Sequence, residues 1–294
     1  MYAALAVVYV VWGSTYLGLK YAGETLPPFL MLAARFAGAG PVLLLLALRQ
    51  GGPRPTWREW RSSLIIGSCL LAGGLGLVTI SEKRVPTGVA ALMIAATPLW
   101  LALLDRLWRG VRLRTAAVVG LAIGFAGVAI LAWPSGGGSF DHAGIVMLAI
   151  SPILWATGSI YARGAPLPSR PLVAAGCEMT AVVPVMLIIA AGRGEFGELG
   201  HVHPSWQSVT ALVYLITIGS LAGFSAYVWL LTVAPISLVG TYAFVNPIVA
   251  VVLGRIFLTE RISHREIAAA VVIVAAVALI VRSQGRAATP QAEP

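Results

Sequence analysis

The feature that most limits the fold of this chain is a series of ten apolar stretches, separated by short polar loops. About 20 apolar residues allow one helix to cross the hydrocarbon core of a bilayer. Backbone groups in lipid must bond within their own segment, which favours helices over open strands. The chain is therefore predicted to be an all-α integral membrane protein with ten transmembrane helices. The stretches cover residues 3–22, 29–48, 62–81, 86–105, 114–133, 143–162, 171–191, 207–230, 236–256 and 265–282.

The second half of the chain repeats features of the first half. Two constant offsets, of 149 and 143 residues, align residues of the same kind. Pairs at the larger offset are Trp57 and Trp206, Pro86 and Pro235, and Pro98 and Pro247. Pairs at the smaller offset are Trp12 and Trp155, Lys20 and Arg163, and Pro41 and Pro184. Internal repeats of this kind in a membrane chain are typical of carriers.

Each repeat contains five predicted spans, and an odd number makes the second copy enter the membrane from the opposite side. We predict one repeat over 1–138, an inverted repeat over 139–283, and a disordered cytoplasmic tail over 284–294. Inverted repeats can exchange conformations, and their substrate sites lie near the bilayer midplane. The alternative is that the duplication is a relic with no functional role.

The distribution of charge argues against a nucleic-acid partner. The chain carries a net charge of +9, but only 11% of its residues are charged, against roughly 25% in a soluble domain. Most of its basic residues lie in short loops between the apolar stretches. Membrane proteins are enriched in Lys and Arg in their cytoplasmic loops, and this explains the positive charge without a nucleic acid. With the N-terminus inside, twelve of them fall in inner loops and seven in outer loops. Both termini are therefore predicted to be cytoplasmic, with the lipid bilayer and a small molecule as partners and the chain as a monomer.

Signals of an enzyme are missing from the sequence. The histidines lie in loops or at span edges with no metal-ligand spacing, and no glycine-rich phosphate loop is present. Cys69 and Cys177 are dispersed within predicted spans and form no disulfide framework. We expect no cofactor, no metal and no catalytic residue. A membrane-embedded enzyme or a lipid scramblase remains the alternative from another functional class.

Several short motifs resemble one known family. They are Val11-Trp12-Gly13-Ser14-Thr15-Tyr16, Leu32-Ala33-Ala34-Arg35-Phe36, Val85-Pro86-Thr87-Gly88-Val89-Ala90-Ala91-Leu92, Thr97-Pro98-Leu99-Trp100, Asn246-Pro247-Ile248 and Leu258-Thr259-Glu260-Arg261-Ile262. Their order and spacing resemble the EamA family of the drug/metabolite transporter superfamily, over residues 3 to 283. The resemblance implies a ten-helix inverted-repeat carrier in the bacterial inner membrane that exports amino acids, other metabolites or cationic drugs. Within the family, the chain is similar to the group with aromatic amino-acid exporters.

One position departs from the family pattern. An acidic residue is usual after the fourth and the ninth span, and Glu260 supplies the second of these. The matching position in the first half is Val111, so a role for a symmetric pair of carboxylates is doubtful.

Aromatic and polar side chains within the spans are the candidate substrate-binding residues, because such groups are costly in lipid and need a reason. Residues four apart lie on the same face of a helix, so the aromatic and polar side chains of a span form a stripe along that face. The candidates are Trp12, Tyr16, Thr79, Met93, Thr97, Trp100, Trp155, Ser159, Tyr227, Tyr242 and Asn246. They would offer stacking surface and a few hydrogen bonds, as small-molecule sites do. The alternative is that these side chains fill helix interfaces or the interfacial aromatic belt.

Prolines inside two of these stripes are candidate hinges. Pro98 and Pro247 each remove a backbone donor, which leaves a carbonyl that Thr97 or Asn246 could satisfy. A kink that serves packing alone is the alternative.

Charged residues in or beside the spans complete the candidate set. Arg35 and Glu178 are matched across the repeats and could form a charge pair. Arg35 could also attract a substrate carboxylate, snorkel to the interface or serve structure, and Glu178 is a candidate for proton coupling. Glu82, which ends the third span, is expected to line an entrance or face water. Together these features predict an exporter of small organic metabolites, with amino acids as the first class, that works by alternating access; cationic drugs are the alternative cargo.

Overall fold

The computed structural model describes residues 1–110, 115–132, 141–233, 242–259 and 263–285, and these residues form helices with no strand among them. Seven helical segments are long and apolar enough to cross a membrane. They are α1 (Tyr2–Thr25), α2 (Pro28–Arg49), Trp57–Ser81, Thr87–Arg109, α8 (His142–Ala162), α9 (Pro171–Gly192) and Trp206–Tyr227. Shorter apolar helices lie within α7 (Thr115–Ala132), α14 (Tyr242–Phe257) and α15 (His264–Gly285).

These helices occupy the apolar stretches of the sequence. The seven long segments match the first four predicted spans and the sixth to eighth, and the three shorter helices fall within the remaining ones. An all-helical membrane fold is therefore confirmed for the described residues. Parts of the predictions lie outside them: residues 236–241 of the ninth span, the junction at 138, Val111, Glu260, and most of the predicted tail (286–294).

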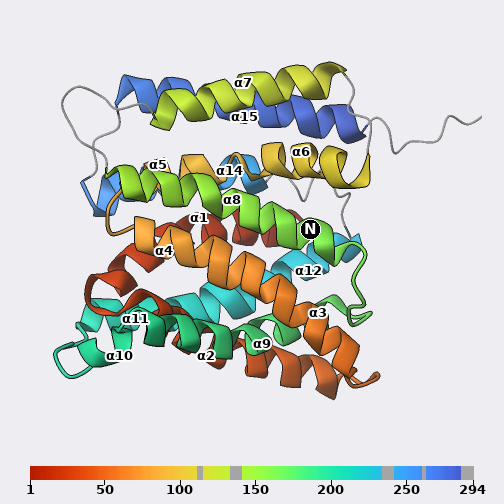
Figure 1. Ribbon diagram of the computed structural model, residues 1–294, viewed down its shortest axis with the longest axis vertical. Helices are drawn as coiled ribbons and strands as arrows, with labels where there is room; N and C mark the ends of the chain where they lie inside the picture. The colour runs from red at the N-terminus through yellow and green to blue at the C-terminus, as the bar shows by residue number, and fades with distance from the viewer. Residues whose placement is uncertain (111–114, 133–140, 234–241, 260–262, 286–294) are drawn as a thin grey trace, which may run out of the picture.

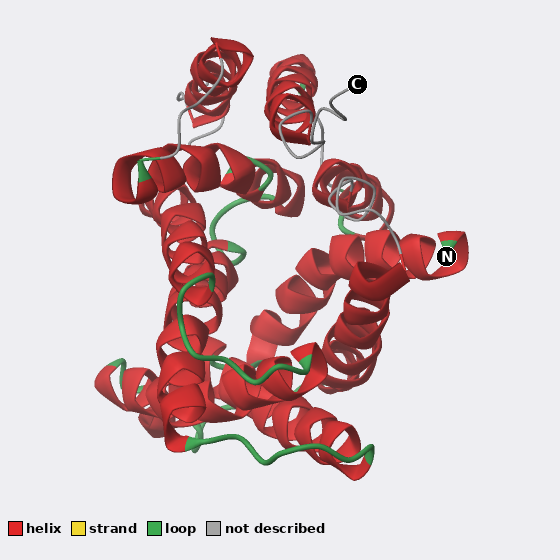
Figure 2. Cartoon of the chain, turned by 90° about the vertical axis from the view of Figure 1, so that its right-hand side faces the viewer, coloured by secondary structure: helices red, strands yellow, loops and turns green. Residues whose placement is uncertain are grey.

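The helices are arranged in layers (Figures 1 and 2). In both views α7 and α15 lie side by side at one edge of the molecule, and α2 and α9 pack together at the opposite edge. Between these edges, α1 packs against α14 and α12 (Gly223–Val233). In the same way, α8 packs against α6 (Thr97–Arg109) and the π-helix η1 (Ser68–Leu75). The contacts of α1 thus resemble those of α8.

Two helices at the offset of 149 residues share the same local design. Thr56 accepts a hydrogen bond from the Glu59 amide (3.4 Å) at the start of α3 (Trp57–Gly67), and the Glu59 carboxylate accepts one from the Thr56 amide. The Ser205 hydroxyl accepts from the Ser208 amide (3.1 Å) at the start of α11 (Trp206–Tyr214). Each helix then widens into a π-helix. These are η1, which is followed by α4 (Gly76–Ser81), and η2 (Leu215–Ala222), which leads into α12.

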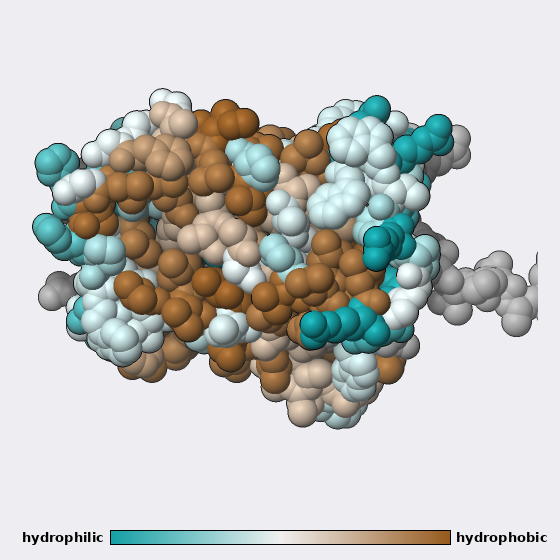
Figure 3. All heavy atoms as spheres, turned by 90° about the horizontal axis from the view of Figure 1, so that it is seen from below, coloured by the Kyte–Doolittle hydropathy of each residue, from teal (hydrophilic) through white to brown (hydrophobic). Residues whose placement is uncertain are grey.

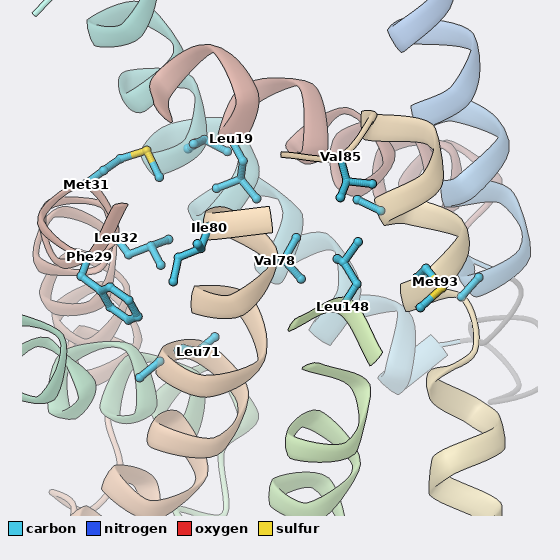
Figure 4. Close-up of a cluster of buried hydrophobic side chains, with 14 of the residues drawn as sticks. Leu19, Phe29, Met31, Leu32, Leu71, Val78, Ile80, Val85, Met93 and Leu148 are labelled. Atoms are coloured by element: carbon cyan, nitrogen blue, oxygen red, sulfur yellow. The ribbon is translucent and has the colours of Figure 1, made fainter. Parts of the chain in front are cut away.

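The apolar surface and core fit a bilayer. Figure 3 shows a broad apolar region between hydrophilic ends, and large side chains such as Ile188 and Leu45 are more than half exposed. In Figure 4, Leu71 of η1 and Val78 and Ile80 of α4 lie between Phe29 of α2 on one side and Leu148 of α8 on the other. Because lipid is as apolar as leucine, close packing rather than burial from water holds such a core together.

The fourth predicted span, 86–105, is a broken helix. It forms α5 (Thr87–Ile94) and α6, with a turn at Ala95 and Ala96. Pro98 has no N–H to bond the Ile94 carbonyl, and the Thr97 hydroxyl donates to that carbonyl instead (2.6 Å). This confirms the expectation that Thr97 satisfies the freed group.

A short helix that the sequence did not predict, α10 (Glu195–Glu198), ties the two halves together. Glu195 is buried, and its carboxylate accepts hydrogen bonds from the amides of Phe29 (2.8 Å) and Leu30 (3.0 Å) at the start of α2. Its other oxygen accepts from Arg193 (3.0 Å). The carboxylate thus satisfies donors that the helix itself leaves free, and its charge suits a helix N-terminus.

Replacing this carboxylate is expected to destabilise the fold. Glu195→Gln keeps the size but removes the charge from three hydrogen bonds, and should lower the free energy of unfolding by about 1–3 kcal/mol. Thermal unfolding in detergent measures the change. Glu198→Gln, at an exposed position of the same short helix, is the control and should change little. Equal melting temperatures for the two variants would contradict the capping role.

Candidate functional site

Three aromatic side chains from α12 and α14 pack around Trp12 of α1. The Trp12 ring of α1 lies 4.9 Å from Tyr227 and 5.5 Å from Phe224, both on α12, and 5.0 Å from Tyr242 on α14. Tyr227 and Tyr242 are 5.8 Å apart at 88°. Three of these four pairs are edge-to-face, which is one of the favoured arrangements of aromatic rings. We call these four residues the aromatic cluster.

Two glycines allow the aromatic cluster to assemble. A Cβ on Gly223 would lie 2.7 Å from the Trp12 indole nitrogen, so the ring occupies the space that a side chain would take. A Cβ on Gly13 would lie 2.5 Å from the Val249 Cβ of α14. Close approach of α12 and α14 to α1 therefore depends on both glycines.

Asn246 fixes α14 beside α1. With its amide nitrogen turned toward two backbone carbonyls, it donates to Tyr9 (3.2 Å) and Tyr242 (3.1 Å). Its neighbour Pro247 lies inside α14, which continues through it without the break seen before Pro98. The two candidate hinges therefore differ in local structure.

A layer of polar side chains lies next to the aromatic cluster. Arg35 of α2 is 4% exposed, and its Nε donates to the Ser220 hydroxyl of η2 (3.0 Å). A hydrogen bond joins the hydroxyls of Ser14 on α1 and Tyr214 on α11. We call these four residues the polar layer. It contains a buried cation and several hydroxyl groups.

Arg35 and Glu178 do not form the charge pair that the sequence suggested. No ion pair joins them in the described part of the chain. The antiparallel helices α2 and α9 cross with Gly40 against Thr180 and Leu44 against Gly176. In this register Glu178 lies level with residue 42 of α2, so it is about seven residues or roughly 10 Å along the helix axis from Arg35.

Two of the predicted tryptophans, Trp100 and Trp155, have their described contacts outside the aromatic cluster. Trp100 packs edge-on against Phe125 of α7 (4.9 Å). In the second repeat, Trp155 lies over Gly74 of η1, whose Cβ would stand 3.2 Å from the ring. Within the described ring contacts, no pair joins Trp100 or Trp155 to Trp12.

The remaining candidates bond or pack within the core. The Thr79 hydroxyl donates to the Leu75 carbonyl of its own helix (2.9 Å), and the Ser159 hydroxyl donates to the Trp155 carbonyl (2.8 Å). Met93 is 1% exposed, and Tyr16 packs against the same core one turn from Trp12.

The acidic residue at the end of the third span is not where the sequence suggested. Glu82 is fully buried rather than facing water, and its carboxylate accepts from the Thr87 hydroxyl (3.1 Å). Lys20 donates to the Glu82 backbone carbonyl. Lys83 and Arg84, which follow Glu82 in the chain, are exposed, as expected.

Sequence reasoning also missed four residues of these groups, and one of them, Ser14, lies on α1. Phe224, Ser220 and Tyr214 belong to the eighth span, which the prediction treated as one plain helix. Ser220 lies within the π-helix η2, and Tyr214 and Phe224 lie shortly before and after it. Phe224 lies three residues before Tyr227 and could have been found from that spacing. Ser220 lies in the π-helix η2, which no residue pattern announces.

Comparison with known proteins gives a consistent result. A profile of the EamA-like transporter family matches residues 1–133 and 142–282. An Escherichia coli K12 protein described as the uncharacterized inner membrane transporter YedA is 38% identical over 282 residues, which cover 95% of this chain and 90% of that one. A second protein of that strain, described as a probable amino-acid metabolite efflux pump, is 25% identical over 92% of this chain and 90% of its own.

A solved crystal structure has the same fold. It is 22% identical to this chain, with a TM-score of 0.63 and a coverage of 98% of both chains. The profile match spans nearly the whole sequence, and the apolar helices with an aromatic cluster and a polar layer between them suit a carrier. The chain belongs to the EamA-like transporter family.

Proposed function

We propose that this membrane transporter exports small organic metabolites, with amino acids as the first class, by alternating access through a site at the aromatic cluster. The observation that carries the proposal is the meeting of Trp12, Tyr227 and Tyr242 from α1, α12 and α14. Aromatic faces beside a few polar groups are what small-molecule sites consist of. The relative described as a probable amino-acid metabolite efflux pump makes amino acids the first cargo to test.

The proposal includes ten spans in two inverted repeats, with both termini in the cytoplasm and the chain as a monomer. The family profile matches two stretches, 1–133 and 142–282, which fall close to the expected repeats. The helices that would be equivalent pack on each other, as α2 does on α9 and α7 on α15. The matched caps and the π-helices η1 and η2 also support it.

Alternating access requires that one helix group moves against another while the site stays between them. The break between α5 and α6 offers a point of bending, because Pro98 removes a helix hydrogen bond there. A cationic drug is the second candidate cargo, since aromatic faces also hold cations. Glu178, half-buried on α9, would favour that cargo or a proton-coupled cycle.

Counterflow in proteoliposomes tests the function. Wild-type protein should exchange at least one member of a radiolabelled amino-acid panel, and Trp12→Ala should reduce its initial rate at least tenfold. Trp57→Ala, at a position 79% exposed and distant in sequence from the site, is the control and should leave the rate unchanged. Trp12→Phe, which keeps a ring, covers the case in which the alanine variant does not fold.

Each outcome decides a different part of the proposal. Exchange of cationic dyes but of no amino acid would move the cationic class to the front. Exchange that survives Trp12→Ala would keep the function and remove the aromatic cluster from the site.

A further inference from the structure

Arg35 is a buried cation whose charge no described side chain balances. It is 4% exposed, so it does not snorkel to an interface, and one of its terminal nitrogens, Nη1, has no hydrogen-bond partner among the described residues. Its described contacts are the Ser220 hydroxyl at Nε and the ring of its neighbour Phe36 at 5.2 Å. Burying a charge without a partner costs several kcal/mol, so such a residue within a membrane span calls for a functional partner.

The acidic side chains of the described region are engaged elsewhere or lie too far away. Asp105, Asp141 and Glu195 form ion pairs with other arginines, and no described ion pair joins an acidic side chain to Arg35. Glu82 accepts a hydrogen bond from Thr87, and Glu59 caps α3. Glu24 and Glu198 are exposed at the ends of α1 and α10. Glu178 is separated from Arg35 by roughly 10 Å along the α2–α9 crossing. An anion from outside these residues would therefore supply what the guanidinium lacks.

The surroundings of the guanidinium suit a carboxylate. Its Nε is held by Ser220, which fixes the plane of the group and leaves the Nη1 and Nη2 donors for a second partner. An arginine fork of this kind bonds a carboxylate through two parallel N–H groups. Gly219 lies beside Nη2, and a Cβ at this position would be 3.5 Å from that nitrogen. Because residue 219 is a glycine, its side chain does not cover the Nη2 edge of the guanidinium.

The same helix connects the guanidinium to the aromatic cluster. Gly219 faces Arg35 and Thr15, and Gly223, four residues later, faces Trp12. Four residues correspond to roughly 6 Å along an α-helix, and to somewhat less where the helix widens into η2. That distance fits a small molecule with its carboxylate at Arg35 and an apolar ring at Trp12.

We propose that Arg35, positioned by Ser220, binds the carboxylate of the transported molecule, and that the cargo is a small carboxylate with an apolar or aromatic body. The proposal rests on the proposed function and narrows its cargo. It assigns the polar layer to the charged end of the molecule and the aromatic cluster to the other end.

Binding to the purified protein tests this without relying on transport. Phenylacetate and phenylacetamide have the same ring and nearly the same shape, and they differ in the charge of one end. Phenylacetate should raise the melting temperature of the wild-type protein in detergent and phenylacetamide should not. Inorganic phosphate and chloride, tested alongside, separate recognition of a carboxylate with its ring from capture of any anion.

Substitution of Arg35 completes the test. Arg35→Gln should raise the phenylacetate Kd at least tenfold, with Arg35→Lys in between because lysine keeps the charge but loses the fork. Arg49→Gln, at the exposed end of the same helix, is the matched control and should bind as the wild type does. Ser220→Ala, which releases the guanidinium plane, should weaken binding severalfold and serves where Arg35→Gln does not fold.

Three results would overturn the assignment: equal stabilisation by phenylacetamide, equal stabilisation by phosphate, or unchanged phenylacetate binding in Arg35→Gln. Failure of the proposed function is a separate result. It would show as carboxylate binding that depends on Arg35 in a protein that exchanges no solute in proteoliposomes.

Discussion

Gly176→Ala is expected to lower the free energy of unfolding by about 1–3 kcal/mol, and Gly176→Leu to prevent recovery of folded protein. A Cβ on Gly176 would lie 2.8 Å from the backbone nitrogen of Leu44 and 2.9 Å from its Cα. Backbone atoms cannot turn aside as the end of a side chain can, so α2 and α9 would have to separate. Overpacking of a tight contact costs about 1–3 kcal/mol for one added methyl group.

The effect should be specific to this crossing. Gly164 has no heavy atom within 4 Å of its missing Cβ, so Gly164→Ala is the matched control and should change stability by less than about 0.5 kcal/mol. Thermal unfolding and size-exclusion chromatography in detergent measure both variants. A Gly176→Ala protein that melts with the wild type would mean that the α2–α9 contact is looser than the structure shows.

The sequence predicted the helices well because the bilayer imposes a simple rule. A segment in lipid must satisfy its own backbone and be long and apolar enough to cross, and both properties can be read locally. The break at Ala95 and Ala96 was not predicted in its position, although Pro98 signalled a kink. The position at which a helix breaks near a proline depends on which neighbouring group donates a hydrogen bond to the carbonyl that the proline leaves free.

Part of the candidate site could also be predicted. Trp12, Tyr227 and Tyr242 were chosen because aromatic residues in spans need a reason, and the structure brings these three together. Trp100 and Trp155 satisfied the same criterion but pack elsewhere. A constant offset between the repeats shows which positions of the chain are equivalent. It does not show which helix faces pack against each other.

The charged residues were the hardest to place. Arg35 meets Ser220 at a separation of 185 residues, and that contact depends on how α2 lies against η2. Glu82 follows an apolar span and precedes two exposed basic residues, a pattern typical of a water-facing end, yet it is fully buried. Burial of a charge at a span end is decided by distant helices, which local hydropathy does not describe.

Gly223→Ala is expected to reduce transport at least tenfold while leaving the protein folded. The added methyl group would lie 2.7 Å from the indole nitrogen of Trp12 and 3.1 Å from the adjacent ring carbon. The ring must therefore shift by a few tenths of an ångström or more, which changes its packing on Tyr227 and Tyr242. A tenfold change in rate corresponds to about 1.4 kcal/mol, which one displaced aromatic contact can account for.

A double substitution separates this steric effect from a general loss of stability. Trp12→Phe removes the part of the indole that the new methyl group would strike, so Gly223→Ala should reduce the initial counterflow rate much less when combined with Trp12→Phe than when introduced alone. Gly23→Ala on α1, where the nearest atom is the Lys83 Cε at 3.6 Å, is the control for an added methyl group and should transport normally. If Gly223→Ala reduced the rate by the same factor in both backgrounds, the steric clash with Trp12 would not be the cause. The aromatic cluster would then not be part of the transport path.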